Sequence, residues 1–239
     1  MTSKTTLAYS GQDLRGQDLS GKDLRGHDLS GKDLRDANLT GAHLTDADLT
    51  NAWMDGANLS GATLYRATLF GTSLAGANLT GAILSATSLS EADLICANLT
   101  GADLTGAVLS GADFTDANLS GATLFRANLT GADLSDATLT GANMEGAELI
   151  GANLSGANLS RADLTNANLT SAILTGAILT GAVLRYADLT GADLYGATLT
   201  DARLLGATLT DADLTEADLT GVYLDELSGA IMTGAVTQG

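Results

Sequence analysis

The sequence predicts an all-β solenoid, a chain wound into a four-sided β-helix of about eleven coils. Leucine recurs every fifth residue from Leu14 to Leu224, replaced only by Met54, Phe114 and Met144. Alanine stands two residues before this position from Ala37 to Ala217, except at Thr72 and Thr87, and side-chain character repeats every twenty residues. Self-similarity at a fixed short period is the mark of stacked repeats. The 239 residues contain no proline and no break in the repeat. We therefore expect one elongated domain.

The repeating unit has five residues, as in Ala97-Asn98-Leu99-Thr100-Gly101, and 43 units follow one another without insertion. In an extended segment the alanine and leucine point to one side and the residue between them points to the other. The last two residues are usually Ser or Thr and then Gly, which favour turns. Each unit is thus a very short strand and a bend, with alanine and leucine filling the interior.

The number of units per coil follows from the longer period. Steps of twenty residues from Ser20 to Thr220 meet only Ser or Thr, whereas steps of fifteen or twenty-five also meet Arg35 or Phe70. Four units therefore close one coil. At ~4.8 Å per coil the rod is roughly 50 Å long.

The two ends depart from the pattern. Residues 1–11 are predicted to form an N-terminal lead or cap, and 12–226 the β-helix. Within it, 12–36 is an atypical polar first coil, because large polar side chains replace the inward alanine and need partners if buried. These replacements are Gln12, Gln17, Lys22, His27 and Lys32. Terminal repeats usually cap the stack, although a basic docking site is the alternative.

Residues 227–239 are predicted to form the C-terminal cap. Their apolar residues leave the five-residue register, so they are candidates for covering the open end or for a dimer contact. They are Leu227, Ile231, Met232 and Val236. We expect either a monomer or an end-to-end homodimer through a terminus.

Charge and composition exclude several classes of protein. The net charge is −17, divided into +1 for residues 1–35 and −18 for 36–239. Such a rod repels nucleic acid, so no direct nucleic-acid binding is expected. The polar N-terminus lacks a secretion signal, and no apolar run is long enough to span a membrane. The expected location is cytoplasmic.

No catalytic, metal or cofactor site is predicted. Cys96 is the only cysteine, which rules out a disulfide within the chain, and His27 and His43 occupy different phases of the repeat. Nucleophilic catalysis requires such groups to be adjacent. An interior filled by alanine and leucine leaves no room for a substrate. We expect a protein that is not an enzyme and carries no cofactor.

Three pairs of an aromatic residue and an arginine are candidate partner-binding sites: Tyr65-Arg66, Phe125-Arg126 and Arg185-Tyr186. They are sixty residues apart, which places them on one edge at intervals of three coils, or ~14 Å. Aromatic and arginine side chains dominate binding hot spots. Local cation–π packing is the alternative.

Two outward columns carry further hypotheses. One column is rich in Asp, including Asp93, Asp113 and Asp133, and is interrupted by the only tryptophan, Trp53. Stacked carboxylates repel and are expected to add no stability, so this column is a candidate for a cationic partner, with Trp53 as an exposed anchor. The other column is mostly Asn, from Asn38 to Asn158. We interpret it as a stabilising ladder, with ion or ice binding as an alternative.

The A(D/N)LXX pattern resembles the pentapeptide-repeat proteins over about nine-tenths of the chain. The resemblance implies a right-handed quadrilateral β-helix and a non-catalytic scaffold or protein-binding rod. It also implies a second hypothesis, because some members mimic duplex DNA and protect a type II topoisomerase, such as DNA gyrase or topoisomerase IV, from inhibitors. This chain differs from such members in having leucine rather than phenylalanine at the centre, and in having no loop.

Overall fold

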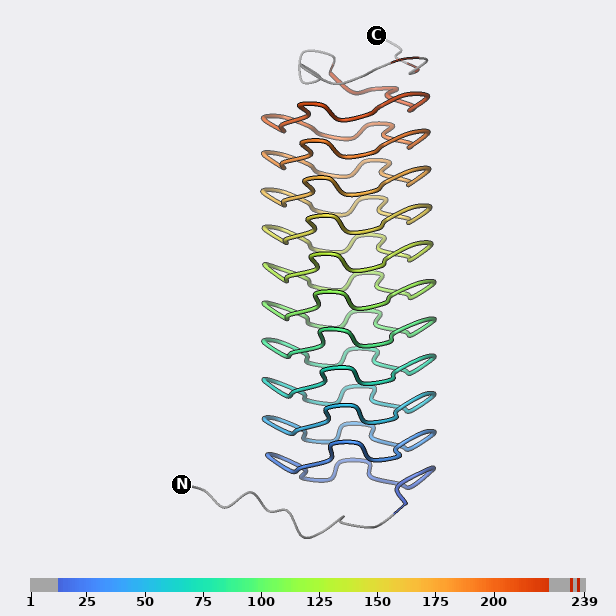
Figure 1. Ribbon diagram of the computed structural model, residues 1–239, viewed down its shortest axis with the longest axis vertical. Coiled ribbons are helices and arrows are strands. Elements are labelled where there is room, and N and C mark those ends of the chain that lie inside the picture. Colours follow the sequence, from blue (N-terminus) through green and yellow to red (C-terminus); the bar gives the residue numbers. More distant parts are fainter. Residues whose placement is uncertain (1–12, 224–232, 234–235, 237–239) are drawn as a thin grey trace.

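The protein is a rod of stacked coils (Figure 1). The computed structural model describes residues 13–223, 233 and 236, so Leu227, Ile231 and Met232 lie outside the described residues. Within this part of the chain no residue is helical, and the β-structure consists of single-residue bridges rather than longer strands. Except at Val236, each bridged residue is the outward residue directly before the leucine position, as expected for very short strands separated by bends.

The register of the coils is twenty residues, which confirms the predicted period. The bridges are parallel, and Asn98 pairs with Asn78 on one side and Asn118 on the other. Four columns of bridges define four faces. We call them face 1 (Asp18 to Asp218 in steps of twenty), face 2 (Asp23 to Arg203), face 3 (Asp28 to Thr208) and face 4 (Asp33 to Asp213). The bend that follows each face is given the same number, as edges 1 to 4.

Backbone hydrogen bonds account for four of the five N–H groups in a regular unit. Three of these bonds join neighbouring coils in a regular unit, so each coil is stabilised by the coils above and below it. In the unit around Leu99 the bonds are Asn98 N–H to Ala77 O (2.9 Å), Leu99 N–H to Asn118 O (2.7 Å), Gly101 N–H to Ser120 O (3.0 Å) and Ala102 N–H to Leu99 O (2.9 Å).

The fifth N–H, on the first bend residue, is bound by the outward side chain. In all 25 described units that carry Asp or Asn before the leucine, Oδ1 accepts this N–H at 2.8–3.3 Å. This is the local bond of an Asx-turn. The preference for Asp and Asn at this position is therefore a preference for a backbone cap.

The second bend residue is left-handed in every unit. Its φ lies between +53° and +78° at all 42 such positions from Gly16 to Gly221, of which 25 are glycine. A positive φ at this position, together with the bond from the next N–H back to the leucine carbonyl, matches a type II turn. Glycine adopts this conformation without strain, whereas any other residue pays a conformational cost of roughly 1–2 kcal/mol.

The interior is formed by the alanine and leucine columns. Ala97 and Leu99 are 0% exposed, and Phe114 and the other replacements of leucine are equally buried. Two threonines replace alanine in this column and are also fully buried. The hydroxyl of each donates a hydrogen bond to a main-chain carbonyl, so neither hydroxyl is left unpaired. Thr72 bonds Leu49 O at 2.8 Å, and Thr87 bonds Leu84 O at 2.6 Å. The core therefore tolerates threonine where a carbonyl accepts its proton.

The ends of the described rod differ from its body. At the positions of the inward alanine, Gln17 and Lys22 are exposed and His27 and Lys32 are half-buried. At the other end Val236 bridges Asp218 after a step of only eighteen residues, and it is 50% exposed. The described residues include no helix long and apolar enough to cross a membrane.

The left-handed bends predict opposite effects for two substitutions in one column. Ala86 has φ +55°, and Gly106, one coil on, has φ +61° and enough open space beside it for a methyl group. We expect Ala86→Gly to raise the free energy of unfolding and Gly106→Ala to lower it, each by about 1 kcal/mol. Urea denaturation measures both. A shift of both variants in one direction would contradict the assignment of strain to this position.

The Asx cap predicts a second pair of variants. Asn98 Oδ1 accepts the Thr100 N–H at 3.1 Å and its hydroxyl proton at 2.7 Å. Asn98→Ala removes this acceptor and is expected to cost about 1 kcal/mol in the free energy of unfolding. Asn98→Asp keeps an oxygen in the same place and serves as the control. Equal losses in the two variants would show that the cap is not the reason for the residue.

Candidate functional site

Edge 2 carries the three aromatic–arginine pairs predicted from the sequence. The twenty-residue register places all of them in one column, at intervals of three coils. Tyr65 is 43% exposed and Tyr186 61%, while Phe125 is half-buried. The three arginines are exposed. The structure thus aligns the candidate residues along one side of the rod.

The first two pairs form cation–π contacts. The Arg66 guanidinium lies 5.6 Å from the centre of the Tyr65 ring, and that of Arg126 lies 5.0 Å from the Phe125 ring. Arg66 also forms an ion pair with Asp46, one coil earlier, with a shortest distance of 2.6 Å between nitrogen and oxygen. This pair raises the pKa of Arg66 through the hydrogen bond to the Asp46 carboxylate. These contacts hold the aromatic rings against the edge.

The third pair is built differently. Its order is reversed, so Tyr186 occupies the left-handed position, with φ +57°, and Arg185 the first bend position. The Tyr186 ring lies over Gly206, where any side chain would collide with it. Among the described residues Arg185 has neither an ion pair nor a ring beneath it. The third pair therefore lies on the predicted edge, but its arginine and its aromatic ring have exchanged bend positions relative to the first two pairs.

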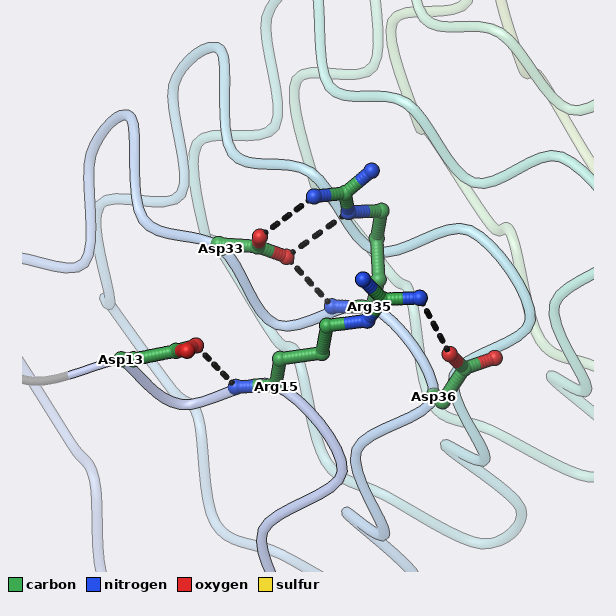
Figure 2. A network of polar contacts seen from close by, with 5 residues as sticks. All are labelled: Asp13, Arg15, Asp33, Arg35 and Asp36. Carbon is green, nitrogen blue, oxygen red and sulfur yellow. Dashed lines mark hydrogen bonds and ion pairs between the residues drawn. The ribbon is translucent and has the colours of Figure 1, made fainter.

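Trp53 is exposed by 54%, as its register predicts, but it does not stand alone. The guanidinium of Arg35, from the preceding coil, lies 4.9 Å from the indole centre. Arg35 in turn donates two hydrogen bonds to the Asp33 carboxylate, at 2.9 and 2.6 Å (Figure 2). The arginine is therefore held between a carboxylate and a ring. This contact links face 4 of one coil to edge 4 of the coil before.

The same end of the rod has further charge pairing. The main-chain N–H of Arg15 donates a hydrogen bond to Asp13 Oδ1 at 2.9 Å, and its guanidinium forms an ion pair with the Asp36 carboxylate at 3.6 Å (Figure 2). Arg25 pairs with Asp23 at 2.6 Å. Such exposed pairs are worth little singly. They do show that three of the basic residues of the first coils are occupied by neighbouring carboxylates.

The Asp column of face 4 is not a bare repulsive array, because its carboxylates also accept hydrogen bonds from the backbone. Each of its Asp side chains binds the N–H of the first bend residue, as at Asp93, Asp113 and Asp133. At Asp213, hydrogen bonds from the Thr215 hydroxyl and N–H lower the pKa of the carboxyl. The signal in the sequence was an Asp or Asn followed two residues later by Ser or Thr, a pattern typical of Asx-turns.

The Asn column of face 1 forms part of the predicted ladder. Asn78 donates through its side-chain amide to Asn58 Oδ1 at 3.2 Å, and Asn38 donates to Asp18 at 3.0 Å. The Thr100 and Ser120 hydroxyls are turned to the Asn of their own units. The polar groups of this face therefore bond largely to one another. No group of three or more potential metal ligands occurs among the described residues.

Edge 2 differs from the other edges in charge and in size of side chain. Four of the five arginines after residue 36 lie on face 2 or edge 2: Arg66, Arg126, Arg185 and Arg203. Large exposed apolar residues on edges 3 and 4 include Phe70, Ile150, Ile95 and Tyr195, without an arginine beside them. Edge 2 is therefore the edge along which aromatic–arginine pairs recur, whereas the Arg35–Trp53 contact lies at edge 4 and face 4 in the first coils.

Comparison with known proteins identifies the repeat. A family model described as pentapeptide repeats matches overlapping segments that together cover residues 13–236. No match was found among curated proteins.

Solved structures of similar proteins include HetL from the cyanobacterium Nostoc sp. strain PCC 7120, a pentapeptide repeat protein involved in heterocyst differentiation regulation. It shares 41% identity over 84% of each chain, with a TM-score of 0.32. Rfr23 from the cyanobacterium Cyanothece 51142 shares 35% identity over 44% of this chain and 63% of its own, with a TM-score of 0.36. QnrB1, a plasmid-mediated fluoroquinolone resistance protein, shares 21% over 84% and 86%, with a TM-score of 0.35.

The contact of Arg35 with Asp33 and Trp53 leads to a prediction for the titration of the Asp33 carboxyl. Hydrogen bonding to Arg35 lowers the pKa of Asp33 to about 2. Because the folded-state pKa lies below the ordinary value of about 3.9, the pair contributes stability above pH 4 that is lost as the pH falls through 2. We expect the Asp33 carboxyl carbon and the Trp53 indole signals to titrate together near pH 2 in NMR spectra. In Arg35→Ala the Asp33 midpoint should rise towards 3.9, and an unchanged midpoint would contradict the contact.

Proposed function

The chain belongs to the pentapeptide-repeat family, and from this premise we propose that it is a non-catalytic rod that binds a protein partner along edge 2. The observation that carries the proposal is the coincidence of exposed aromatic rings and arginines on that edge. Such side chains supply large contact area and directional hydrogen bonds, and they dominate measured hot spots. The rings of the first two pairs already contact their own arginines, so these side chains lose less conformational freedom on binding.

The shape we infer for the rod suits an extended partner. We propose a right-handed winding and about eleven coils. Because neighbouring pairs are three coils apart, a partner in contact with all three pairs would span about 28 Å along edge 2. In the first two pairs the aromatic residue occupies the first bend position and the arginine the second. A partner with apolar groups repeated along its length would match this spacing.

A scaffold fits the chemistry of the body better than an enzyme does. Alanine and leucine fill the interior from Ala37 to Leu219. The carboxylates that cover the faces bind their own backbone, as at Asp188, whose pKa is lowered by hydrogen bonds from the Thr190 hydroxyl and N–H. A lowered pKa keeps Asp188 ionised, which suits a structural cap and a charged surface rather than general acid catalysis.

A second candidate function rests on charge. Residues 36–239 carry a net charge of −18 on a regular rod, which would favour a partner with a cationic groove, as a duplex-DNA mimic does. The partner would then be a type II topoisomerase, DNA gyrase or topoisomerase IV, protected from its inhibitors. This function would engage the acidic faces rather than edge 2, so the two proposals can be separated by experiment.

The test of the main proposal compares two triple variants with the wild type. Tyr65→Ala/Phe125→Ala/Tyr186→Ala removes the rings of edge 2, and Phe70→Ala/Ile150→Ala/Tyr195→Ala removes exposed groups of similar size from edges 3 and 4. In affinity capture from the source cell with quantitative mass spectrometry, we expect a partner retained by the wild type and the control variant and reduced at least ten-fold by the edge 2 variant. Identical retention by both variants would overturn the proposal.

The same proteins test the second candidate. In a gyrase supercoiling assay with and without a fluoroquinolone, a DNA mimic would inhibit the enzyme at high concentration or restore its activity in the presence of the drug. The edge 2 variant should then act as well as the wild type. Absence of both inhibition and rescue would remove the topoisomerase hypothesis and leave the main proposal to the capture experiment.

A further inference from the structure

A hollow of about 500 Å³ opens on face 2, near the C-terminal end of the described coils. Three pairs of residues one coil apart line it: Arg185 and Leu205, Asp201 and Gly221, and Arg203 and Tyr223. Arg203 is the last bridged residue of face 2 and Tyr223 follows it by one step of twenty residues, while the other two pairs form the borders on edges 2 and 1. The volume lies within the range of small-molecule sites, about 300–1,000 Å³.

The arginines of the hollow differ in charge pairing from those in the first coils of the rod. Arg15, Arg25, Arg35 and Arg66 each pair with a carboxylate at 2.6–3.6 Å. Among the described residues no carboxylate forms such a pair with Arg185 or Arg203. Asp201, an acid that lines the hollow, has its carboxylate directly against Gly221 at the border, where a side chain on residue 221 would displace it.

The reversed order of the third aromatic–arginine pair is the reason for this arrangement. In the first two pairs the arginine follows the aromatic residue and lies over its ring. In the third pair Tyr186 takes the left-handed position and lies over Gly206. Arg185 then stands at the first bend position, bordering face 2, and contributes to the hollow beside Arg203.

The hollow also offers apolar and aromatic surface. Leu205 is 49% exposed and Tyr223 78% exposed, which is the highest exposure among the large hydrophobic residues of the described chain. An exposed phenol ring beside a leucine stacks well against another planar ring. Guanidinium groups bind carboxylates and phosphates through paired, charge-assisted hydrogen bonds.

We propose that this hollow binds a small aromatic oxyanion, a planar ring that carries a carboxylate or a phosphate. Arg185 and Arg203 hold the oxyanion, while Tyr223 and Leu205 cover the ring. The rest of a chain with net charge −17 repels an anion, so two unpaired arginines concentrate it at one place. The site shares Arg185 and Leu205 with edge 2, but it needs no protein partner, because the residues that line the hollow supply all of the proposed contacts.

The test uses phenyl phosphate and phenylacetate as probes and neutral phenylacetamide as the uncharged analogue, with binding followed by NMR chemical shifts and calorimetry on the full chain. We expect saturable binding of at least one anion, and affinity reduced at least ten-fold by Arg185→Gln and by Arg203→Gln. The two anions distinguish a phosphate from a carboxylate as the preferred group. Tyr223→Ala should weaken binding more than Tyr223→Phe does.

Arg161→Gln is the matched control, since Arg161 is an exposed arginine on edge 1, away from the hollow. It should bind as the wild type does, and circular dichroism should show the same fold for all variants. The proposal is overturned if neither anion binds saturably, if the amide binds as tightly as the anions, or if Arg161→Gln lowers affinity as much as the two substitutions in the hollow.

Discussion

The structure depends on the main-chain hydrogen bonds that tie each unit to the units twenty residues before and after it. The outward residue donates to one neighbouring coil and the leucine to the other, as Asn98 and Leu99 do. Because a bridge is only one residue long, no single face is stable alone, and the bonds act cooperatively through four faces at once. This explains why the five-residue length is kept without insertion: one additional residue would move every later leucine out of the interior.

This backbone pattern also decides what the outward side chains do. Four N–H groups per unit are bound by other main-chain groups, and Asp or Asn supplies an acceptor for the fifth. Much of the acidity of the rod thus has a structural origin. The carboxylates cap bends in their own units, and their charge is a secondary property that a cationic partner would meet.

Function is consequently expected where the repeat is relaxed. Outward positions without Asp or Asn, and first bend positions without Ser or Thr, are not needed for the cap. Tyr65 and Phe125 lie at such bends, and Arg203 and Tyr223 at such outward positions. Edge 2 and face 2 gather several of these departures on one side of the rod. The reversed pair Arg185-Tyr186 shows that a change of order alone alters what an arginine contacts, since the left-handed residue and the first bend residue point to different surroundings.

The sequence by itself determined the five-residue unit, the inward columns and the twenty-residue register, because a period and an alternation are properties of the chain alone. It also placed Tyr65, Phe125 and Tyr186 on one edge. Only the tertiary structure decided which side chains meet across coils: Arg35 over Trp53, Arg66 with Asp46, and Arg185 beside Arg203 in one hollow. It also showed that the Asp column caps the backbone. Such contacts depend on side-chain conformation and on the left-handed bends. The sequence register gives the position of each residue on the rod, but not the direction in which its side chain points.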